Sequence, residues 1–389
     1  MKRVLLRGPF LTSSGYGVHS RQIARWALTK KNWNVSFQTL HWGVTPWILD
    51  DKDTLIKKIM EKTITLQGQP VFDLSIQIQL PNEWDPKLAH ENIGVTAAVE
   101  TDMCNPSWIM SCNAMSCVVV PSRHTCSTIT NTASVKNIQL TTNVVVIPES
   151  FYDEILDSSI VPLNHDFSTK FNFLVFGQLT GKNPENDRKN LFYTLKWMFE
   201  EFRSDDDVGI ILKTNSGKNT KIDKMVTNRV LSQIIKESRP TKNPRVHFLH
   251  GKMKNREMVS LMKHETVRAL ATFTRGEGYG LPILEAAAVG LPVIATGWSG
   301  HTDFLGSNYT SVEYDLGEIH KTRVDEKIFL SGAKWAHPHE KDAKKKMRKF
   351  YQKPSMFKHR AQKLSKSIRQ NYSFDSVSNI YDQKLDRYI

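Results

Sequence analysis

The chain has 389 residues, 40% of them hydrophobic, and a formal net charge of +14. That length favours two domains over one, and 18 Phe and 9 Trp supply apolar side chains for two cores. No run approaches the ~18 consecutive apolar residues of a membrane-spanning helix. The opening MKRVLLRGPF is typical of a first strand, not of a signal peptide. We therefore expect an intracellular, cytoplasmic protein, with a peripheral position at a membrane left open.

The first half of the chain alternates short apolar strands with helical segments. VLLRGP begins a strand at Val4, the loop TSSGYG follows, and the pattern predicts a helix over residues 17–30. Helices are also expected over 105–114 and 122–131, and strands in WNVSFQTL, FDLSIQIQL, NIGVTAAV, SCVVVP and VVVIPESF. Strands that alternate with helices at this spacing are typical of a parallel sheet, so residues 1–160 predict a Rossmann-like domain.

The pattern restarts after a polar stretch near residues 155–170. A helix is expected over 188–202, and strands in FNFLVFG, VGIILKT, VHFLHG, VRALATFT and PVIAT. Residues 161–372 therefore predict a second Rossmann-like domain, and 373–389 a helix that packs back on the N-terminal domain. The fold class is α/β, and ligands of such sheets bind at the carboxyl ends of the parallel strands.

The cysteines and histidines do not predict a metal site. The four cysteines contain no Cys-x2-Cys pair, and their spacing differs from that of structural zinc sites: Cys104, Cys112, Cys117 and Cys126. No cluster of His, Asp and Glu has metal-ligand spacing either. We expect reduced thiols and no bound metal.

The positive charge is concentrated in residues 341–369, called the basic region below. It holds 12 Lys and Arg and one acid, which leaves the rest of the chain close to balance. Such a segment suggests an anionic partner, either a membrane surface or a nucleic acid. A solvated helical face explains the same charge, and the sequence leaves both interpretations open. Helical spacing predicts that Lys345, Arg348 and Lys349 share one helical face.

The segment TRGEGYGLPILEAAAVGLPVIATGWSGHTDF, residues 274–304, carries the clearest chemistry. An expected strand leads into a loop with three glycines at 276, 278 and 280, and a helix is expected to begin near Leu281. Pro282 suits a first helical turn, because its missing N–H costs nothing there. Free backbone N–H groups and the dipole at such a start form a site suited to a diphosphate.

Two glutamates flank this helix start. Glu277 lies in the glycine loop and Glu285 one turn inside the helix. Because carboxylates repel phosphate, we expect both to face hydroxyl groups, such as those of a sugar and a ribose. The alternative is a helix whose acidic first turn merely matches the dipole, which explains Glu277 but not the three glycines.

The same segment resembles the donor-site signature of glycosyltransferase family 4, Glu-x7-Glu followed by Ala-x-x-x-Gly-x-Pro-Val-Ile-Ala, with Glu277 and Glu285 at the two glutamates. Further matching segments are VLLRGPFLTSSGYG, VVVPSRHTCSTI, VVVIPESF, DRKN and WAHPHEKDAKKKMRKFY. The resemblance implies a GT-B fold and transfer of a hexosyl or pentosyl group with retention of configuration. It also implies a nucleoside diphosphate sugar, such as a UDP or GDP sugar, as co-substrate, with no cofactor and no required metal.

The resemblance assigns roles to residues of the donor site. Glu277 would contact the sugar hydroxyls and Glu285 the ribose. Backbone amides at the helix start would hold the sugar and the phosphates: Tyr279, Gly280 and Leu281.

The cations of DRKN would neutralise the diphosphate that leaves. Lys189 has the main role and Arg188 assists, because a growing negative charge suits an ammonium beside a guanidinium. The alternative is an ordinary exposed helix start. Many family members carry an Arg where this chain has Gln178, and Arg188 or Lys213 would substitute for it.

Three further candidates lie in the N-terminal half. Glu100 stands where many members carry a His, so it would orient an acceptor hydroxyl or stabilise positive charge on the sugar; the alternative is a strand-end acid that caps the next helix. Gly15 and Gly17 allow a ligand to approach the backbone closely, unless they only serve a turn. His19 and His301 are isolated, and we expect them to pack or cap.

The sequence thus predicts a retaining glycosyltransferase that acts on an acceptor hydroxyl of a glycan, a lipid or another polymer. The alternative is a nucleic-acid-binding protein that uses the basic region, or a transferase that glycosylates modified DNA. The basic region lacks interleaved aromatic residues for base stacking, which weakens the purely binding role. The donor base, the sugar, the acceptor and the oligomeric state are not determined by the sequence.

Overall fold

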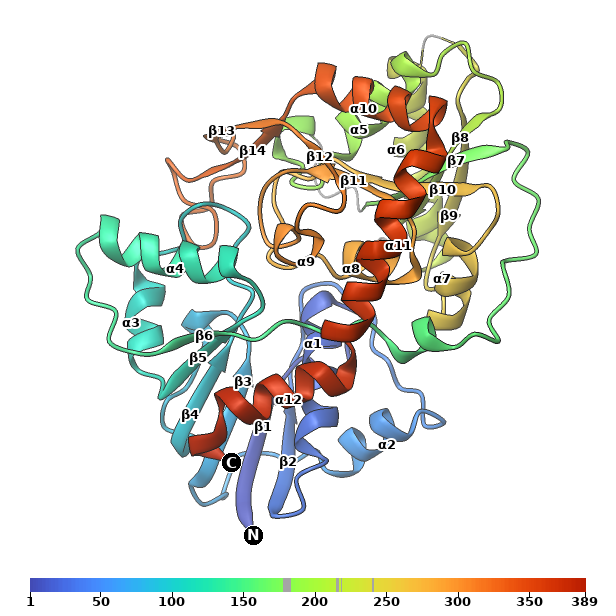
Figure 1. Ribbon diagram of the computed structural model, residues 1–389. Coiled ribbons are helices and arrows are strands. Elements are labelled where there is room, and N and C mark those ends of the chain that lie inside the picture. Colours follow the sequence, from blue (N-terminus) through green and yellow to red (C-terminus); the bar gives the residue numbers. More distant parts are fainter. Residues whose placement is uncertain (178–182, 215–216, 218, 240) are drawn as a thin grey trace. The chain divides into compact units, whose positions relative to one another are not determined.

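The computed structural model describes residues 1–177, 183–214, 217, 219–239 and 241–389. The chain forms two compact units (Figure 1). Unit 1 comprises Met1–Ser150, Asp325–Leu330 and Phe374–Ile389, and unit 2 comprises Phe151–Val324 and Ser331–Ser373. The last residues of the chain therefore belong to the same unit as the first.

Unit 1 is built on a six-stranded sheet in the order β2-β1-β3-β4-β5-β6, and all its strand pairs are parallel. The strands are β1 (Lys2–Gly8), β2 (Trp33–Thr39), β3 (Phe72–Ile78), β4 (Ala89–Val95), β5 (Cys117–Val120) and β6 (Val144–Val146). All six contain or overlap the predicted segments. The segment NIGVTAAV leaves the sheet after Val95, and Ala98 has a positive φ of 47°.

The helices of unit 1 are α1 (Gly15–Ala27), α2 (Thr54–Glu61), α3 (Ser107–Asn113), α4 (Arg123–Val135) and α12 (Phe374–Lys384). Helices α1, α2 and α12 share one apolar core with the sheet. The Tyr381 ring of α12 lies 4.9 Å from the Trp26 ring of α1, and Trp26 Nε1 donates to Asp382 at 2.7 Å. Apolar and polar contacts thus tie the last helix to the first.

Unit 2 contains a second parallel six-stranded sheet in the order β12-β11-β10-β7-β8-β9. The strands are β7 (Phe171–Phe176), β8 (Val208–Thr214), β9 (Arg245–His250), β10 (Val267–Thr272), β11 (Val293–Thr296) and β12 (Thr310–Val312). Phe173 and Val175 face one core and Leu174 faces the other. Both faces are covered, which explains why these strands are apolar throughout.

The helices of unit 2 are α5 (Leu191–Glu201), α6 (Lys221–Ser238), α7 (Asn255–Met262), α8 (Leu281–Val289), α9 (Thr302–Leu305), α10 (Glu340–Gln352) and α11 (Pro354–Asn371). Helices α5, α6 and α10 contribute to one core, and α7, α8 and most of the buried face of α11 to the other. An antiparallel pair, β13 (Tyr314–Glu318) and β14 (Lys334–Pro338), was not predicted, and neither was β12.

One helix boundary differs from the sequence prediction and matters for the site. The helix predicted over 188–202 begins only at Leu191, so the prediction that the Arg188-Lys189 pair lies in it is wrong. Asn190 precedes the helix with φ of 53°, which turns the backbone away from the helical path. The two cations therefore lie in a turn before α5.

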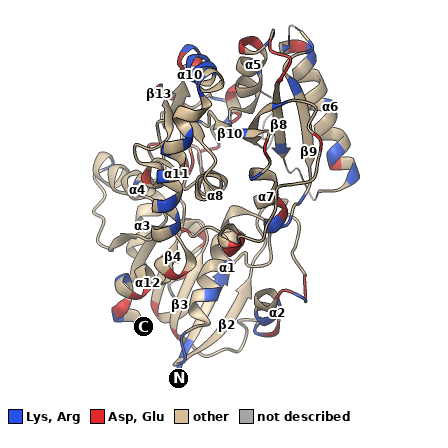
Figure 2. Ribbon diagram, turned by 45° about the vertical axis from the view of Figure 1, so that its right-hand side comes forward, with Lys and Arg blue, Asp and Glu red and all other residues tan. Residues whose placement is uncertain are grey.

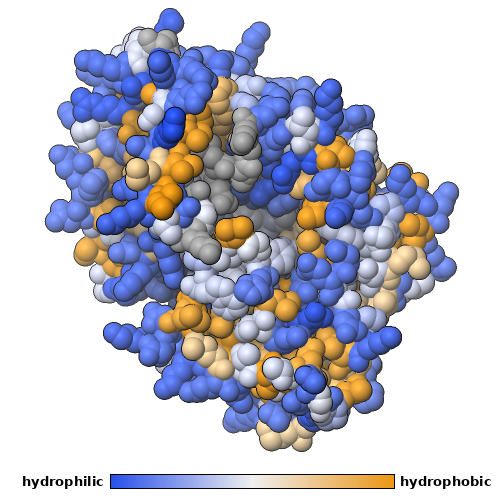
Figure 3. Space-filling model, turned by 180° about the vertical axis from the view of Figure 1, so that it is seen from behind, coloured by the Kyte–Doolittle hydropathy of each residue, from blue (hydrophilic) through white to orange (hydrophobic). Residues whose placement is uncertain are grey.

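The surface of the described residues is mixed in polarity. Apolar and hydrophilic side chains alternate in patches on the face shown in Figure 3. One helix exposes several large apolar side chains, Ile222, Met225, Val226 and Val230 of α6. Within the described part of the chain, no helix has both the length and the hydropathy that crossing a bilayer requires.

Candidate active site

The loop between β10 and α8 packs backbone to backbone against the loop after β11. Gly300 N–H donates to the carbonyl oxygen of Glu277 at 2.8 Å, and a Cβ at Gly300 would lie 2.1 Å from the carbonyl oxygen of Gly278. Glu277 N–H donates to Ser299 Oγ at 2.8 Å. Only glycine fits at position 300, and the contact fixes the backbone that carries Glu277.

The start of α8 has the geometry expected of an anion site. The helix begins at Leu281, as predicted, and Gly280 precedes it with φ of 102°, a conformation that favours glycine. Pro282 has no N–H, and Ile283 N–H donates to the carbonyl oxygen of Gly280 at 2.9 Å. This helix start therefore attracts an anion through the Leu281 N–H and the positive end of the helix dipole. Tyr279 is buried beside this start. Glu285 lies one turn inside the helix. Burial raises the pKa of Tyr152, and the charge of Glu285 raises it further.

The Glu277 carboxylate is buried between two cations. Lys189 Nζ lies 2.7 and 2.8 Å from its two oxygens, and Arg188 Nη1 lies 3.2 Å from Oε2. The Glu277 side chain is 9% exposed. Burial by itself would raise the pKa of Glu277, but attraction to Lys189 and Arg188 outweighs it and holds this pKa at about 2. The carboxylate is therefore ionised at neutral pH and can only accept hydrogen bonds.

Backbone hydrogen bonds hold the turn that carries the two cations. The Asp187 carboxylate accepts from the backbone N–H groups of Lys189 and Leu191 at 3.1 and 2.7 Å. Arg275 N–H donates to the carbonyl oxygen of Arg188 at 2.8 Å. The turn is thus hydrogen-bonded to the glycine loop, and these bonds fix Arg188 and Lys189 without the help of a ligand.

A buried cation next to the glycine loop escaped the sequence analysis. The Arg275 side chain is 4% exposed and lies 3.3 Å from the Glu185 carboxylate. It also donates to His337 Nδ1 at 2.5 Å, and burial followed by the charge of Arg275 lowers the pKa of His337. A charged residue directly after the apolar strand VRALATFT was the available signal. Because the Arg275 guanidinium is bound to Glu185 and His337, we infer that Arg275 stabilises the glycine loop.

Lys213 and His301 lie close to the same sheet edge. Lys213 is the penultimate residue of β8 and lies beside Gly177. Its Nζ donates to the carbonyl oxygen of Gly251 at 2.5 Å, and burial lowers its pKa to about 8. His301 is fully buried, and its Nε2 lies 2.8 Å from the carbonyl oxygen of Thr296. The contacts of His301 are those of a packing residue. Gln178, which the sequence analysis compared with an Arg, lies outside the described residues.

The two candidate glycines of unit 1 differ in their surroundings. A Cβ at Gly17 would lie 2.3 Å from the carbonyl oxygen of Thr12, and Gly17 N–H donates to Ser14 Oγ, the cap of α1. The turn alone explains that glycine. A Cβ at Gly15 would meet nothing within 4 Å. Of these two glycines, Gly15 is therefore the one with free space beside its backbone, where a ligand could approach.

An aromatic pair next to Gly15 was not predicted from the sequence. The Tyr16 ring stacks on Trp42 with centroids 3.9 Å apart and planes at 21°. Tyr16 OH accepts from Ala97 N–H at 3.0 Å, and burial raises the Tyr16 pKa, with a smaller contribution from the nearby charge of Glu100. Glu100 therefore lies in the same neighbourhood of unit 1 as the Gly15 loop.

The structure thus brings most of the predicted donor-site residues together within unit 2. Arg188, Lys189 and Glu277 are in direct contact, the start of α8 and Glu285 follow on the same segment, and Lys213 lies at the same edge of the sheet. Glu100, Gly15 and Gly17 belong to unit 1. The four cysteines are free, and the described residues contain no group of three His, Cys, Asp or Glu that could hold a metal ion.

Comparison with known proteins adds a family match and a fold match. Residues 230–320 match the family described as glycosyl transferases group 1. No curated protein matches the sequence. Sucrose-phosphate synthase from Thermosynechococcus elongatus has a similar structure, with a TM-score of 0.63 and 12% identity over 100% of this chain and 99% of that one. HepE from Anabaena, solved in complex with UDP and glucose, has a TM-score of 0.65 and 12% identity over 100% of both chains.

These matches confirm the GT-B fold and the resemblance to group 1 glycosyltransferases. The matched residues include the glycine loop, Glu277 and Glu285, but not Arg188 or Lys189. At 12% identity the structural likeness shows the fold alone. Family 4 in particular stays a prediction, and so do the roles of the site residues.

Proposed function

We propose that this protein is a retaining glycosyltransferase that moves a hexosyl or pentosyl group from a nucleoside diphosphate sugar to an acceptor hydroxyl. The observation that carries the proposal is the Lys189–Glu277–Arg188 cluster beside the start of α8. Two cations next to the N-terminal end of α8 suit a diphosphate, and a carboxylate that is ionised at neutral pH suits sugar hydroxyls.

The cluster suggests how the donor is received. Without a ligand, the Glu277 carboxylate pairs with Lys189 and Arg188 and so offsets the repulsion between these two close cations. A bound diphosphate offers the cations a second anionic partner, and the Glu277 oxygens then accept from hydroxyls of the sugar. Because the negative charge on the diphosphate grows as the glycosidic bond breaks, Lys189 and Arg188 bind the transition state more tightly than the donor.

The remaining donor contacts follow from the same segment. Backbone N–H groups of Tyr279, Gly280 and Leu281 would meet the phosphates, and Glu285 would accept from the ribose diol. Lys213, with a pKa near 8, supplies a further cation at this edge of the sheet. HepE was solved with UDP and glucose, so a UDP sugar is the first donor to test, with a GDP sugar next.

The acceptor belongs on unit 1 in this proposal. Gly15 leaves its loop open, and the half-buried Trp42, stacked on Tyr16, is the aromatic side chain proposed to meet the acceptor there. Glu100 is the carboxylate that would orient the acceptor hydroxyl. Aromatic faces pack well against the C–H faces of sugar rings, so a glycan is the acceptor class that this surface favours.

The proposal is tested by thermal unfolding of the whole chain with UDP, GDP, ADP and their sugar derivatives. A nucleotide at 100 times its dissociation constant should add about 2.7 kcal/mol of stability. Glu285→Ala should gain less stability from the nucleotide than the unmodified chain does, and its matched control is Glu265→Ala, which removes an exposed carboxylate outside residues 274–304. If no nucleotide stabilises the chain, the proposal is wrong.

A further inference from the structure

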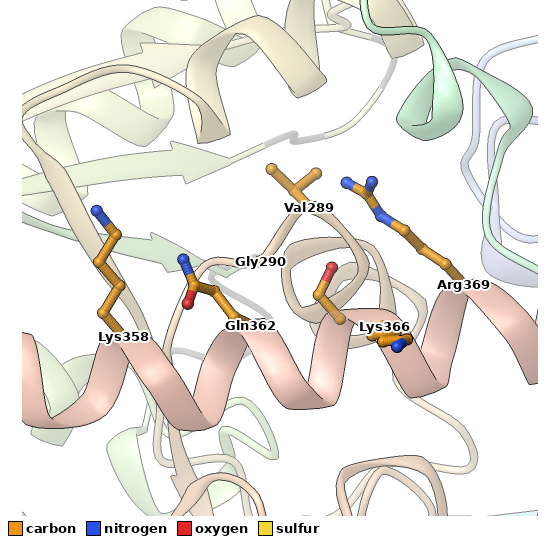
Figure 4. Close-up of a pocket in the computed structure, with 7 residues that line it drawn as sticks. Val289, Gly290, Lys358, Gln362, Lys366 and Arg369 are labelled. Carbon is orange, nitrogen blue, oxygen red and sulfur yellow. The ribbon is translucent and has the colours of Figure 1, made fainter.

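A pocket of about 520 Å³ lies at the opposite end of α8 from the glycine loop. The last turn of α8 and one face of α11 form its walls. The α11 residues are spaced by three or four positions, so they share one side of the helix: Lys358, Gln362, Ser365, Lys366 and Arg369. Figure 4 shows Lys358, Gln362 and Arg369 extending from the same side of α11.

The lining of this pocket is positively charged. It includes three cations and, among the described residues, no carboxylate. The whole of α11 contains no acid, and blue segments recur along its ribbon in Figure 2. The pocket therefore differs from the Glu277 site, where a carboxylate balances the cations.

The lysines of the pocket have no internal partner. Within the described part of the chain, Lys358 and Lys366 make no hydrogen bond or ion pair, whereas Lys344, Lys346 and Arg348 of α10 all pair with acids. Arg369 donates from Nε to the carbonyl oxygen of Ala288 at 2.7 Å. That bond fixes the guanidinium at the end of α8 and leaves its two terminal nitrogens available.

The carbonyl groups at the C-terminal end of α8 would normally repel an anion, but one of them already accepts two hydrogen bonds. Ser365 Oγ also donates to the Ala288 carbonyl oxygen at 2.7 Å, so hydroxyl and guanidinium donors neutralise this helix end. Like charges that line one pocket without a counterion give it a positive potential, and a bound anion lowers that potential.

We infer that this pocket binds a phosphate group. The fork of Arg369 can hold two phosphate oxygens, and the Lys366 ammonium, one turn away on α11, supplies charge beside it. Gln362 and Lys358 lie one and two turns further along the same helix side, where Lys358 adds to the positive potential. A free phosphate and the headgroup of a phosphate-bearing lipid present the same oxygens. The nine residues of α8 separate the pocket from the glycine loop by about 13 Å of helix. The pocket is thus a second anion site, and it does not depend on the proposed transferase activity.

The test compares two double variants of the full chain with equal loss of charge. Lys358→Ala with Lys366→Ala removes the pocket lysines. Lys353→Ala with Lys363→Ala is the control, because both residues are exposed, unpaired within the described structure and outside the pocket lining. Calorimetric titration with inorganic phosphate and co-sedimentation with phosphatidylcholine vesicles, with and without phosphatidic acid, are the two measurements. Arg188 and Lys189 are intact in both variants, so phosphate held there contributes equally.

We expect the pocket variant to bind at least one of the two probes about tenfold more weakly or worse, and the control to match the unmodified chain. Loss with inorganic phosphate identifies a site for free phosphate; loss only with phosphatidic acid vesicles identifies a headgroup site. Equal weakening in both variants would mean diffuse attraction and would overturn the inference. So would an unmodified chain that binds neither probe, or a pocket variant that binds as well as the control. Thermal unfolding of each variant verifies that it is folded.

Discussion

Lys189 Nζ lies within 2.8 Å of both carboxylate oxygens of Glu277, although 88 positions separate the two residues in the chain. The contact joins the turn before α5 to the glycine loop before α8. It gives Lys189 a carboxylate partner in the absence of ligand, and a diphosphate would replace that partner when the donor binds.

Replacing Lys189 by Ala should reduce turnover more than donor binding. The charge that Lys189 meets is larger in the transition state than in the ground state, so kcat should fall about 100-fold or more while KM changes little. Steady-state kinetics with a donor series measures both constants. Lys196→Ala on α5 is the control and should leave both unchanged. A change confined to KM would assign Lys189 to ground-state binding.

The ionised state of Glu277 should make stability depend on acid pH. Its pKa in the folded chain is about 2, below the ordinary value of 4.5. A depressed folded pKa adds stability above the unfolded value, and that stability is lost as pH falls from about 4.5 towards 2. Urea unfolding at pH 5 and pH 3 should therefore show a smaller loss for Glu277→Gln than for the unmodified chain. The control Glu265→Gln, at an exposed position, should lose as much stability as the unmodified chain. An equal loss of unfolding free energy between pH 5 and pH 3 in all three proteins would refute the prediction.

Glu285→Ala should weaken nucleoside diphosphate binding by about 1–3 kcal/mol, the range for a lost hydrogen bond to a charged group. Calorimetric titration with the nucleotide that stabilises the chain best gives the dissociation constant. Glu265→Ala serves as control for the lost charge. If Glu285→Ala binds the nucleotide as well as the unmodified chain, Glu285 does not contact the ribose.

The sequence was informative where a local rule determines the structure. Gly280 before the helix and Pro282 in its first turn predict that α8 begins at Leu281. Both signals are local and do not depend on the rest of the chain. The start of α5 was misplaced because Asn190 adopts a left-handed conformation, stabilised by a tertiary bond from its Nδ2 to the carbonyl oxygen of Phe273. No local pattern encodes such a bond.

Contacts between distant segments were likewise beyond the sequence. The Arg275 side chain lies between Glu185 and His337, which are 90 and 62 positions away. Trp42 stacks on Tyr16 across a loop. The motif predicted that Lys189 and Glu277 serve one ligand, but it did not predict that they pair with each other when no ligand is present. That pairing depends on how the two loops dock.

The basic region is less uniformly available than its composition suggested. Arg348 was predicted to share one helical face with Lys345 and Lys349, and of these three side chains it is the one that pairs with acids in the described structure. Its guanidinium binds Glu201 at 2.7 Å and Asp205 at 2.9 Å. The two acids lie at the end of α5 and just beyond it, and tertiary packing of α10 on α5 brings them close.

Five of the twelve cations of the basic region are held inside unit 2. Lys344, Lys346 and Arg348 pair with acids, and Arg360 and Arg369 bind backbone carbonyl oxygens. The remaining seven make no hydrogen bond or ion pair through their side chains among the residues described: Lys341, Lys345, Lys349, Lys353, Lys358, Lys363 and Lys366. Three of them, Lys341, Lys345 and Lys349, recur every four residues and form an exposed stripe along α10.

We predict that this stripe on α10 places the protein beside an anionic surface. At about 1 kcal/mol for each lysine near an anionic membrane, the triple variant Lys341→Ala/Lys345→Ala/Lys349→Ala should bind such vesicles roughly 100-fold more weakly at low salt. Co-sedimentation with phosphatidylserine vesicles, and separately with duplex DNA, across a salt series provides the measurement. The matched control replaces three lysines that already have acidic partners: Lys196, Lys344 and Lys346. Their removal lowers the net charge by the same three units but leaves the stripe intact, so it should change binding much less. Binding of DNA but not of vesicles would favour a nucleic acid acceptor, and absence of both at 50 mM salt would leave the stripe as a solvated helical face.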